Sequence, residues 1–205
     1  MARRPARTPS RRHRRHPGDF RRQRAYPLGC RPIRGARYLA IAPAIFDQVE
    51  KGFDVGYDPE SRARGIEIAG KLDREQVLRD VASAVEVAKP AGKVGIVGYC
   101  LGGTVVWTAA ARVAGLSAAV GYYGGGIIGL KDLKPRVPTL LHFGEKDPNI
   151  PLEGVRQVAA LHPDVEVHTY PADHAFNRDD GANYDAPSAA LALTRTLGFF
   201  AKHVG

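Results

Sequence analysis

Three side chains of this 205-residue chain, Cys100, Asp147 and His174, are of the types that perform nucleophilic catalysis. A thiolate can attack a carbonyl carbon, an imidazole can move the protons, and a carboxylate can hold that imidazole in the correct tautomer and orientation. Each residue also has an ordinary alternative. A cysteine often packs as a small buried hydrophobe, an aspartate before proline often serves in a turn, and a loop histidine is often only solvated. The three occur in the order nucleophile, acid and histidine, each after a predicted strand, and we therefore favour their joint action.

Cys100 lies in a sequence typical of a nucleophile elbow, a tight strand-to-helix turn that holds its central side chain outward. An apolar run ending at Val97 leads into the sequence Gly-Tyr-Cys-Leu-Gly-Gly at 98–103. The glycines permit the tight turn, and the helix expected to begin near Gly102 would place the thiol at a helix N-terminus. That position favours a thiolate. The sequence therefore predicts a cysteine nucleophile at this turn.

Predicted strands and helices alternate from residue 38 onward, and these three residues follow the strands. Strands are predicted at 38–43, 94–97, 117–123, 139–143 and 165–170. Helices are predicted at 73–87, 102–114, 152–161 and 188–203, and residues 52–59 are predicted to form a loop. This alternation predicts an α/β fold, a mostly parallel sheet flanked by helices on both faces. In such a sheet Cys100, Asp147 and His174 would lie at the carboxyl ends of strands.

The composition fits one folded domain inside a reducing compartment. With 44% hydrophobic residues, the chain has enough apolar side chains to bury a core, and no apolar run is long enough to span a bilayer. Cys30 and Cys100 are the only cysteines, so no disulfide framework is expected. No pair of histidines or cysteines has a spacing typical of metal ligands. We therefore expect a cytoplasmic monomer with no cofactor, no metal and no membrane partner.

The net charge of +9 arises in the first part of the chain. Residues 1–37 contain thirteen arginines and one acid, whereas residues 38–205 contain more acids than bases. This basic segment could be a nucleic-acid-binding arm, an organelle transit peptide, or a segment that is not the intended protein sequence. Few aromatic residues argue against the first hypothesis, and five prolines argue against the amphipathic helix of the second. We favour the third hypothesis and expect no nucleic-acid partner.

The chain resembles the dienelactone hydrolase family of α/β-hydrolases over residues 38–205. The resemblance is carried by Gly-Tyr-Cys-Leu-Gly-Gly at 98–103, Ala-Val-Gly-Tyr-Tyr-Gly at 119–124, the Asp147 loop and His-Ala-Phe-Asn-Arg at 174–178. It implies an α/β-hydrolase-like fold and a hydrolase that opens a small carboxylate-bearing lactone, or a related ester, through a Cys-His-Asp triad and a thioester intermediate. A general carboxylesterase or thioesterase remains open within the enzyme class. A non-catalytic polyanion-binding protein that uses the basic segment is the alternative outside it.

The same resemblance implies roles for residues around the triad. Arg178, four residues after the histidine, and one arginine of the pair Arg62 and Arg64 would bind the substrate carboxylate, a task that suits a planar guanidinium. We favour Arg64 in that pair, and its alternative is a solvated charge at the start of a helix. Tyr122 would supply a hydroxyl to the pocket. The Leu101 amide would be one donor to the oxyanion.

Residues 1–37 depart from the family pattern. Family members carry a segment resembling V-V-I-Q-E-I-F-G-V-N, followed by a helix, before the predicted strand at 38–43. Codons compatible with the sequence from Arg14 onward encode V-V-I-Q-E-I-F-G-V-N-A-H-I-R when they are read from the second base. Only the middle base of each shifted codon can be chosen, so a chance match of this length is improbable. We therefore predict a frame error upstream of Arg14 that is undone near Arg37, and disorder in the resulting segment.

The predicted frame error has a functional consequence. In the family, the glutamate of Q-E-I-F-G contacts the resting cysteine, and the amide of the next residue completes the oxyanion hole. Gly18 and Asp19 occupy the shifted positions in this chain. Loss of one oxyanion donor lowers the rate by about two to three powers of ten. A buried strand and its covering helix would also be lost, so we expect the chain as given to be poorly active and poorly stable.

Overall fold

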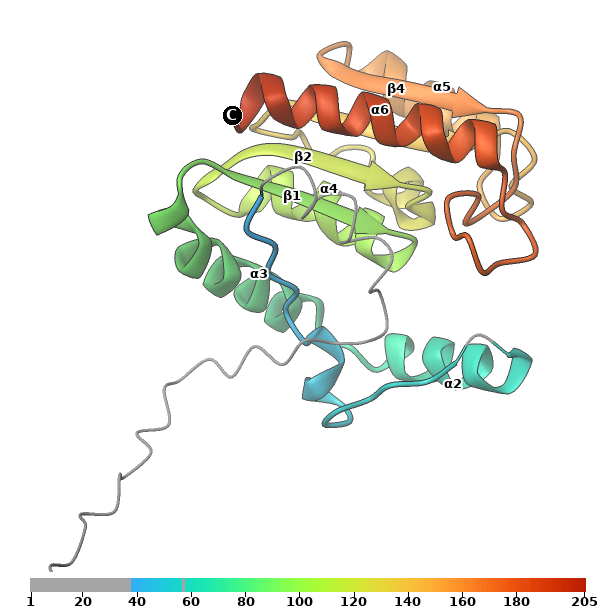
Figure 1. Cartoon of the computed structure of the whole chain (residues 1–205), viewed down its shortest axis with the longest axis horizontal. Coiled ribbons are helices and arrows are strands. Elements are labelled where there is room, and N and C mark those ends of the chain that lie inside the picture. The colour runs from blue at the N-terminus through green and yellow to red at the C-terminus, as the bar shows by residue number, and fades with distance from the viewer. Residues whose placement is uncertain (1–37, 57) are drawn as a thin grey trace, which may run out of the picture.

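Four parallel strands form the centre of the structure, a computed structural model that describes residues 38–56 and 58–205 (Figure 1). The strands are β1 (Val94–Tyr99), β2 (Leu116–Tyr122), β3 (Thr139–Gly144) and β4 (Val165–Tyr170). They lie side by side in the order β1-β2-β3-β4, and each neighbouring pair is parallel. The predicted α/β fold with a parallel sheet is thus confirmed, and all four carboxyl ends lie at one edge.

Helices cover both faces of the sheet. On one face α4 (Leu101–Arg112) packs on β1 and β2, and α3 (Arg74–Ala88) packs against α4. On the other face α6 (Ala186–His203) packs on β2 and β3. The other helices of the described residues are α2 (Pro59–Gly70), α5 (Leu152–Leu161) and three 3-10 helices, η1 (Ile45–Gln48), η2 (Lys89–Ala91) and η3 (Gly125–Leu130).

Two glycines of β1 show that these faces are opposite. Side chains alternate between the faces along a strand, so positions 95 and 98 face different sides. A Cβ atom on Gly95 would lie 2.8 Å from the Phe200 ring of α6, whereas one on Gly98 would lie 2.2 Å from the Gly102 carbonyl oxygen of α4. A side chain at position 95 would therefore require the Phe200 ring to move, and one at position 98 would collide with the backbone of α4.

The structure corrects one expectation in the first part of the described chain and adds one helix there. Residues 38–43 form no strand: Leu39 is 64% exposed, and β1 pairs only with β2 among the described residues. An apolar run without a partner strand leaves its backbone groups unpaired, and composition alone does not supply that partner. No bounds were predicted for helix α2, although Asp58 accepts from the Ser61 amide at 2.9 Å and Pro59 occupies the first helical position, both typical of a helix start.

The predicted frame-shifted segment, residues 1–37 with Cys30, lies outside the described residues. The domain boundary at residue 38 therefore stays a prediction. Within the described part of the chain, none of the helices has both the length and the apolar character that crossing a bilayer requires.

Candidate active site

Cys100 lies at the sharp turn between β1 and α4, as the sequence predicts. Its backbone has φ of 53° and ψ of −116°, a conformation that residues other than glycine rarely adopt. The turn is held by hydrogen bonds from the Cys100 amide to the Tyr122 carbonyl and from the Gly103 amide to the Cys100 carbonyl, each 3.0 Å long. Gly98 permits this close return because it has no Cβ atom to meet Gly102. The turn leaves the Cys100 side chain exposed.

The structure brings the three predicted side chains together. The Cys100 Sγ atom lies 3.3 Å from His174 Nε2, and His174 Nδ1 lies 2.5 Å from Asp147 Oδ2. Asp147 follows β3, and its buried carboxylate also accepts from the Asn149 amide at 2.9 Å through Oδ1. Both carboxylate oxygens are thus engaged, which fixes the orientation of the acid toward the imidazole.

The loop of residues 171–185, which carries His174, lies beyond the arrowheads of the strands (Figure 1). The His174 amide donates to Asp173 Oδ1 at 2.5 Å, and the His174 carbonyl accepts from Asn183 Nδ2 at 3.1 Å. The imidazole also lies against the ring of Tyr123, with ring centroids 4.9 Å apart. Contacts from the loop itself and from the end of β2 therefore hold this histidine.

The electrostatics favour a charged pair between thiol and imidazole. Partial desolvation of the thiol by the surrounding protein raises the pKa of Cys100, but the hydrogen bond and charge of His174 and the hydrogen bond of the Leu101 amide bring it below its ordinary value. Burial likewise lowers the pKa of His174, but its hydrogen bonds to Cys100 and Asp147 outweigh that effect and raise the pKa to about 9. The two shifts have one cause, since a thiolate and an imidazolium stabilise each other.

The two candidate arginines are each paired with carboxylates of the chain. The guanidinium of Arg64, on α2, lies 2.5 Å from Glu50 and 2.7 Å from Glu67. Arg178 Nε lies 3.1 Å from Asp180 Oδ1, within the same loop as His174. The structure thus places Arg178 in the loop of the triad histidine and Arg64 in a surface ion-pair network, with Arg62 exposed on the same helix.

Tyr122 does not present its hydroxyl to Cys100. Its side chain is 2% exposed, and its hydroxyl lies 2.6 Å from Thr196 Oγ1 of α6. The alternation of side chains along β2 turns it to the α6 face, so the structure does not support the predicted pocket hydroxyl. The next residue, Tyr123, contacts His174 instead. The two adjacent tyrosines mark this place in the sequence, but the sequence does not show which of them faces the histidine.

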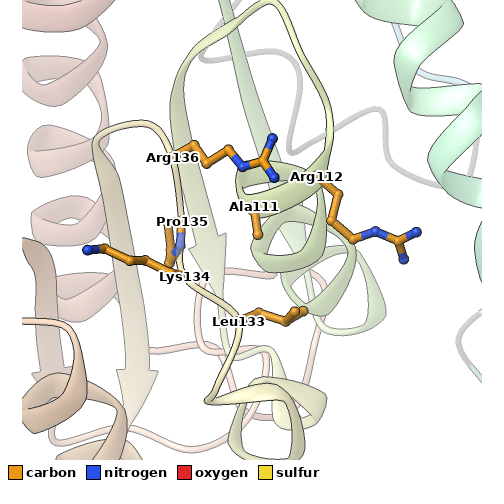
Figure 2. A pocket seen from close by; sticks show the side chains of 6 residues that line it. All are labelled: Ala111, Arg112, Leu133, Lys134, Pro135 and Arg136. Atoms are coloured by element: carbon orange, nitrogen blue, oxygen red, sulfur yellow. The ribbon is translucent and has the colours of Figure 1, made fainter.

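A cavity of about 580 Å³ lies away from the triad, at the far end of α4 (Figure 2). Three basic residues line it: Arg112, Lys134 and Arg136. Their charged ends point in different directions, and the Arg112 guanidinium donates to both carboxylate oxygens of Glu75 at 2.6 and 2.8 Å. These cations therefore do not converge on one ligand. Across the described residues, no cluster of three or more histidine, cysteine or acidic side chains could hold a metal ion.

A nucleophile elbow on a parallel sheet with helices on both faces places this chain among the α/β-hydrolases. More narrowly, the model of the dienelactone hydrolase family matches residues 30–204, and the chain belongs to that family.

Relatives agree with this assignment. The carboxymethylenebutenolidase of Pseudomonas putida is 34% identical over 177 residues, which cover 80% of this chain and 74% of the relative. Carboxymethylenebutenolidase 1 of Cupriavidus pinatubonensis is 29% identical over 178 residues, covering 82% and 75%. The crystal structure of a protein assigned to the dienelactone hydrolases, from Klebsiella pneumoniae, matches with a TM-score of 0.67 and 32% identity and covers 81% and 76%. The chain is therefore an ester-cleaving hydrolase.

Proposed function

We propose that this hydrolase opens a small carboxylate-bearing lactone of the dienelactone type, or a related ester, with Cys100 as the nucleophile. The observation that carries the proposal is the distance of 3.3 Å between Cys100 Sγ and His174 Nε2, combined with the 2.5 Å contact of His174 Nδ1 with Asp147. A thiolate that faces an imidazolium, backed by a carboxylate, is suited to acyl transfer.

The reaction has two halves. In the first, the Cys100 thiolate attacks the lactone carbonyl, and the oxyanion that forms is stabilised by the Leu101 amide at the start of α4. The carbon–oxygen bond of the ring breaks, the leaving alkoxide takes the Nε2 proton of His174, and a thioester remains. In the second half, His174 removes a proton from water as it attacks the thioester. The carbon–sulfur bond then breaks, which restores the thiolate and the imidazolium and yields a carboxylic acid that releases its proton to solvent.

Arg178 supports the proposal that the substrate bears a carboxylate, because it lies in the same loop as His174. A guanidinium can bind a carboxylate through two parallel hydrogen bonds. A general carboxylesterase is the second candidate, because Arg64 and Arg178 both already contact acidic side chains of the chain. The two candidates differ in whether a charged substrate is preferred.

The nucleophile is tested by replacing Cys100. Kinetics of lactone and ester hydrolysis should be measured for the chain as given and for a frame-corrected chain. In the frame-corrected chain, Cys100→Ala should lower kcat by about a thousandfold or more, because the attacking atom is gone. Cys100→Ser is the matched control, since it keeps nearly the same size. A Cys100→Ala protein with full hydrolytic activity would end the proposed mechanism.

The substrate class is tested with Arg178→Gln. On a carboxylate-bearing lactone this variant should raise KM about tenfold or more, because a charge-assisted hydrogen bond is lost. On the methyl ester of the same lactone it should have little effect. Equal effects on both substrates would favour the general carboxylesterase.

We also propose that residues 14–37 arise from a shifted reading frame, so that the chain as given lacks the family segment whose glutamate helps His174 to activate the cysteine and whose next amide completes the oxyanion hole. Resequencing of the gene decides this. Unbroken reads that encode residues 14–37 as printed would contradict a sequencing error and would leave a genuine basic arm or a decayed gene. Salt-sensitive DNA binding that is lost when residues 1–37 are deleted would then support the polyanion-binding alternative.

A further inference from the structure

Strained backbone conformations are concentrated around the proposed nucleophile. Among the described residues, three residues other than glycine have a positive φ: Cys100 at 53°, Tyr123 at 37° and Ala175 at 60°. Cys100 is the elbow itself, and Ala175 directly follows His174. Strain of this kind persists only where the surrounding structure enforces it, and it is typical of functional sites. Tyr123 is strained in the same way, although the proposed mechanism gives it no role.

The backbone of Tyr123 is fixed from two sides. Its amide donates to the His142 carbonyl of β3 at 2.7 Å, just where β2 ends. The next residue, Gly124, approaches the start of α4 so closely that a Cβ atom there would lie 2.8 Å from the Gly103 carbonyl carbon. Tyr123 thus occupies a rigid position between β3 and the helix that begins at the nucleophile.

The Tyr123 side chain contacts the histidine loop twice. Its ring, in a residue only 3% exposed, lies 4.9 Å from the His174 imidazole between centroids, at a tilt of 57°. Its hydroxyl donates to Asn177 Oδ1, three residues further along the same loop. The imidazole is thus bounded by Cys100 at Nε2, by Asp147 at Nδ1 and by the Tyr123 ring at its side.

We propose that Tyr123 is a positioning residue for His174: its ring keeps the imidazole aligned with Cys100, and its hydroxyl holds the loop that carries the histidine. The inference rests on the proposed cysteine mechanism, because alignment of the imidazole matters only if it forms an ion pair with the thiol. A misaligned imidazole would stabilise the thiolate less well, and the thiol would then require a higher pH to react.

The test measures the reaction of Cys100 with iodoacetamide as a function of pH, which needs no catalytic turnover. Mass spectrometry of the Cys100 peptide separates its signal from that of Cys30. Tyr123→Leu should lower the alkylation rate at pH 6.5 by about fivefold and move the profile to higher pH, as expected for the loss of one aromatic contact. Tyr123→Phe keeps the ring and should restore the wild-type profile. Asn177→Ala, which removes the partner of the hydroxyl, should raise the rate of proteolysis within the loop.

The control is Tyr170→Leu, which removes a buried ring of the same cluster that packs on His142 and Phe176. It should lower the melting temperature and leave the alkylation profile in place. If Tyr123→Leu unfolds, Tyr123→Met replaces it, since methionine fills irregular space better. A folded Tyr123→Leu or Tyr123→Met protein with the wild-type profile would overturn the positioning role alone. A wild-type Cys100 that reacts only near the ordinary thiol pKa would instead overturn the proposed ion pair.

Discussion

Two histidines of this protein, His174 and His142, form hydrogen bonds through both ring nitrogens, yet their pKa values are shifted in opposite directions. His174 lies between Cys100 and Asp147 at the edge of the sheet, and its pKa is raised to about 9. His142 lies inside the molecule on β3, with Nδ1 2.8 Å from the Tyr170 hydroxyl and Nε2 3.1 Å from Thr196 Oγ1. Burial, with smaller effects of nearby cations, lowers its pKa to about 3.

The difference shows that the charge of the partners, more than burial, sets the state of a histidine in this fold. Burial disfavours the charged form of both rings. His174 overcomes it because its partners are a thiol and a carboxylate that become anions. The partners of His142 are neutral hydroxyls, and one of them accepts from Arg195 at 3.1 Å. One imidazole is therefore held ready for acid–base chemistry and the other serves as a neutral part of the core.

The backbone differs between the two regions in the same sense. Every described non-glycine residue with positive φ belongs to the triad, follows it directly or contacts its histidine. The cluster of His142, Tyr170 and Thr196 lies instead on regular strands and a helix. Regular elements can hold a neutral hydrogen-bonded core. Holding a thiol and an imidazole against each other at the edge of the sheet requires a sharp turn and an irregular loop.

Removal of the Asp147 charge should separate the two histidine regions by the largest difference in activity. Asp147→Asn should lower kcat by about a thousandfold to ten-thousandfold, because His174 loses the partner that fixes its tautomer and stabilises its charged form. Ester hydrolysis by the frame-corrected chain measures this. His142→Gln is the matched control from the neutral region, and its kcat should stay within a few-fold of wild type. Equal losses in the two variants would remove the distinction between the regions.

A substitution in the elbow at Cys100 should have the next largest effect, a loss of stability. Gly98→Ala should lower the free energy of unfolding by about 3 kcal/mol, because the new Cβ atom would lie 2.2 Å from the Gly102 carbonyl oxygen. Gly102→Ala is its control, since nothing lies within 4 Å of a Cβ atom there and alanine favours a helix. Urea denaturation compares the two. Equal stability of the two variants would contradict the close packing of strand against helix.

His142 should make a smaller contribution to the free energy of unfolding, and this contribution should depend on pH. Its folded pKa of about 3 lies below the ordinary value of 6.5, so between these values the unfolded chain binds a proton that the folded chain does not. The free energy of unfolding should therefore fall as the pH falls through this range, by up to about 1.4 kcal/mol per pH unit. His142→Gln removes this contribution and should flatten the curve of urea stability between pH 4 and 6.5. Curves of equal slope would mean that His142 is protonated in the folded protein.

Features with local signals could be predicted from the sequence. The turn at Cys100 follows from an apolar run, glycines and a helix start, and the places of Asp147 and His174 follow from strand ends that must share one edge. The helix starting at Asp73 was also expected, and Asp73 accepts from the Glu75 amide at 2.9 Å. The meeting of the three side chains at this edge follows from these positions, whereas the order of the strands in the sheet was not predicted from the sequence.

Features that depend on a distant partner could not be predicted. Residues 38–43 have the composition of a strand, but no described strand lies beside them. Arg64 is bound by Glu50 and Glu67, a pairing that spacing along the chain does not reveal. The choice between Tyr122 and Tyr123 depends on which face of β2 meets α6. Each of these outcomes is decided by tertiary packing, which a single sequence does not encode locally.

The most direct test of the ion pair is a titration of the two histidines by nitrogen-15 NMR, with their signals assigned through His142→Gln and His174→Gln. We expect the His174 ring to stay protonated up to a pH of about 9 and the His142 ring to stay neutral from pH 8 down to the acid limit of the fold. In Cys100→Ala the pKa of His174 should fall, because one of the two partners that hold its charge is gone. A His174 ring that is neutral at pH 7.5, or a pKa unchanged by Cys100→Ala, would contradict the thiolate–imidazolium pair.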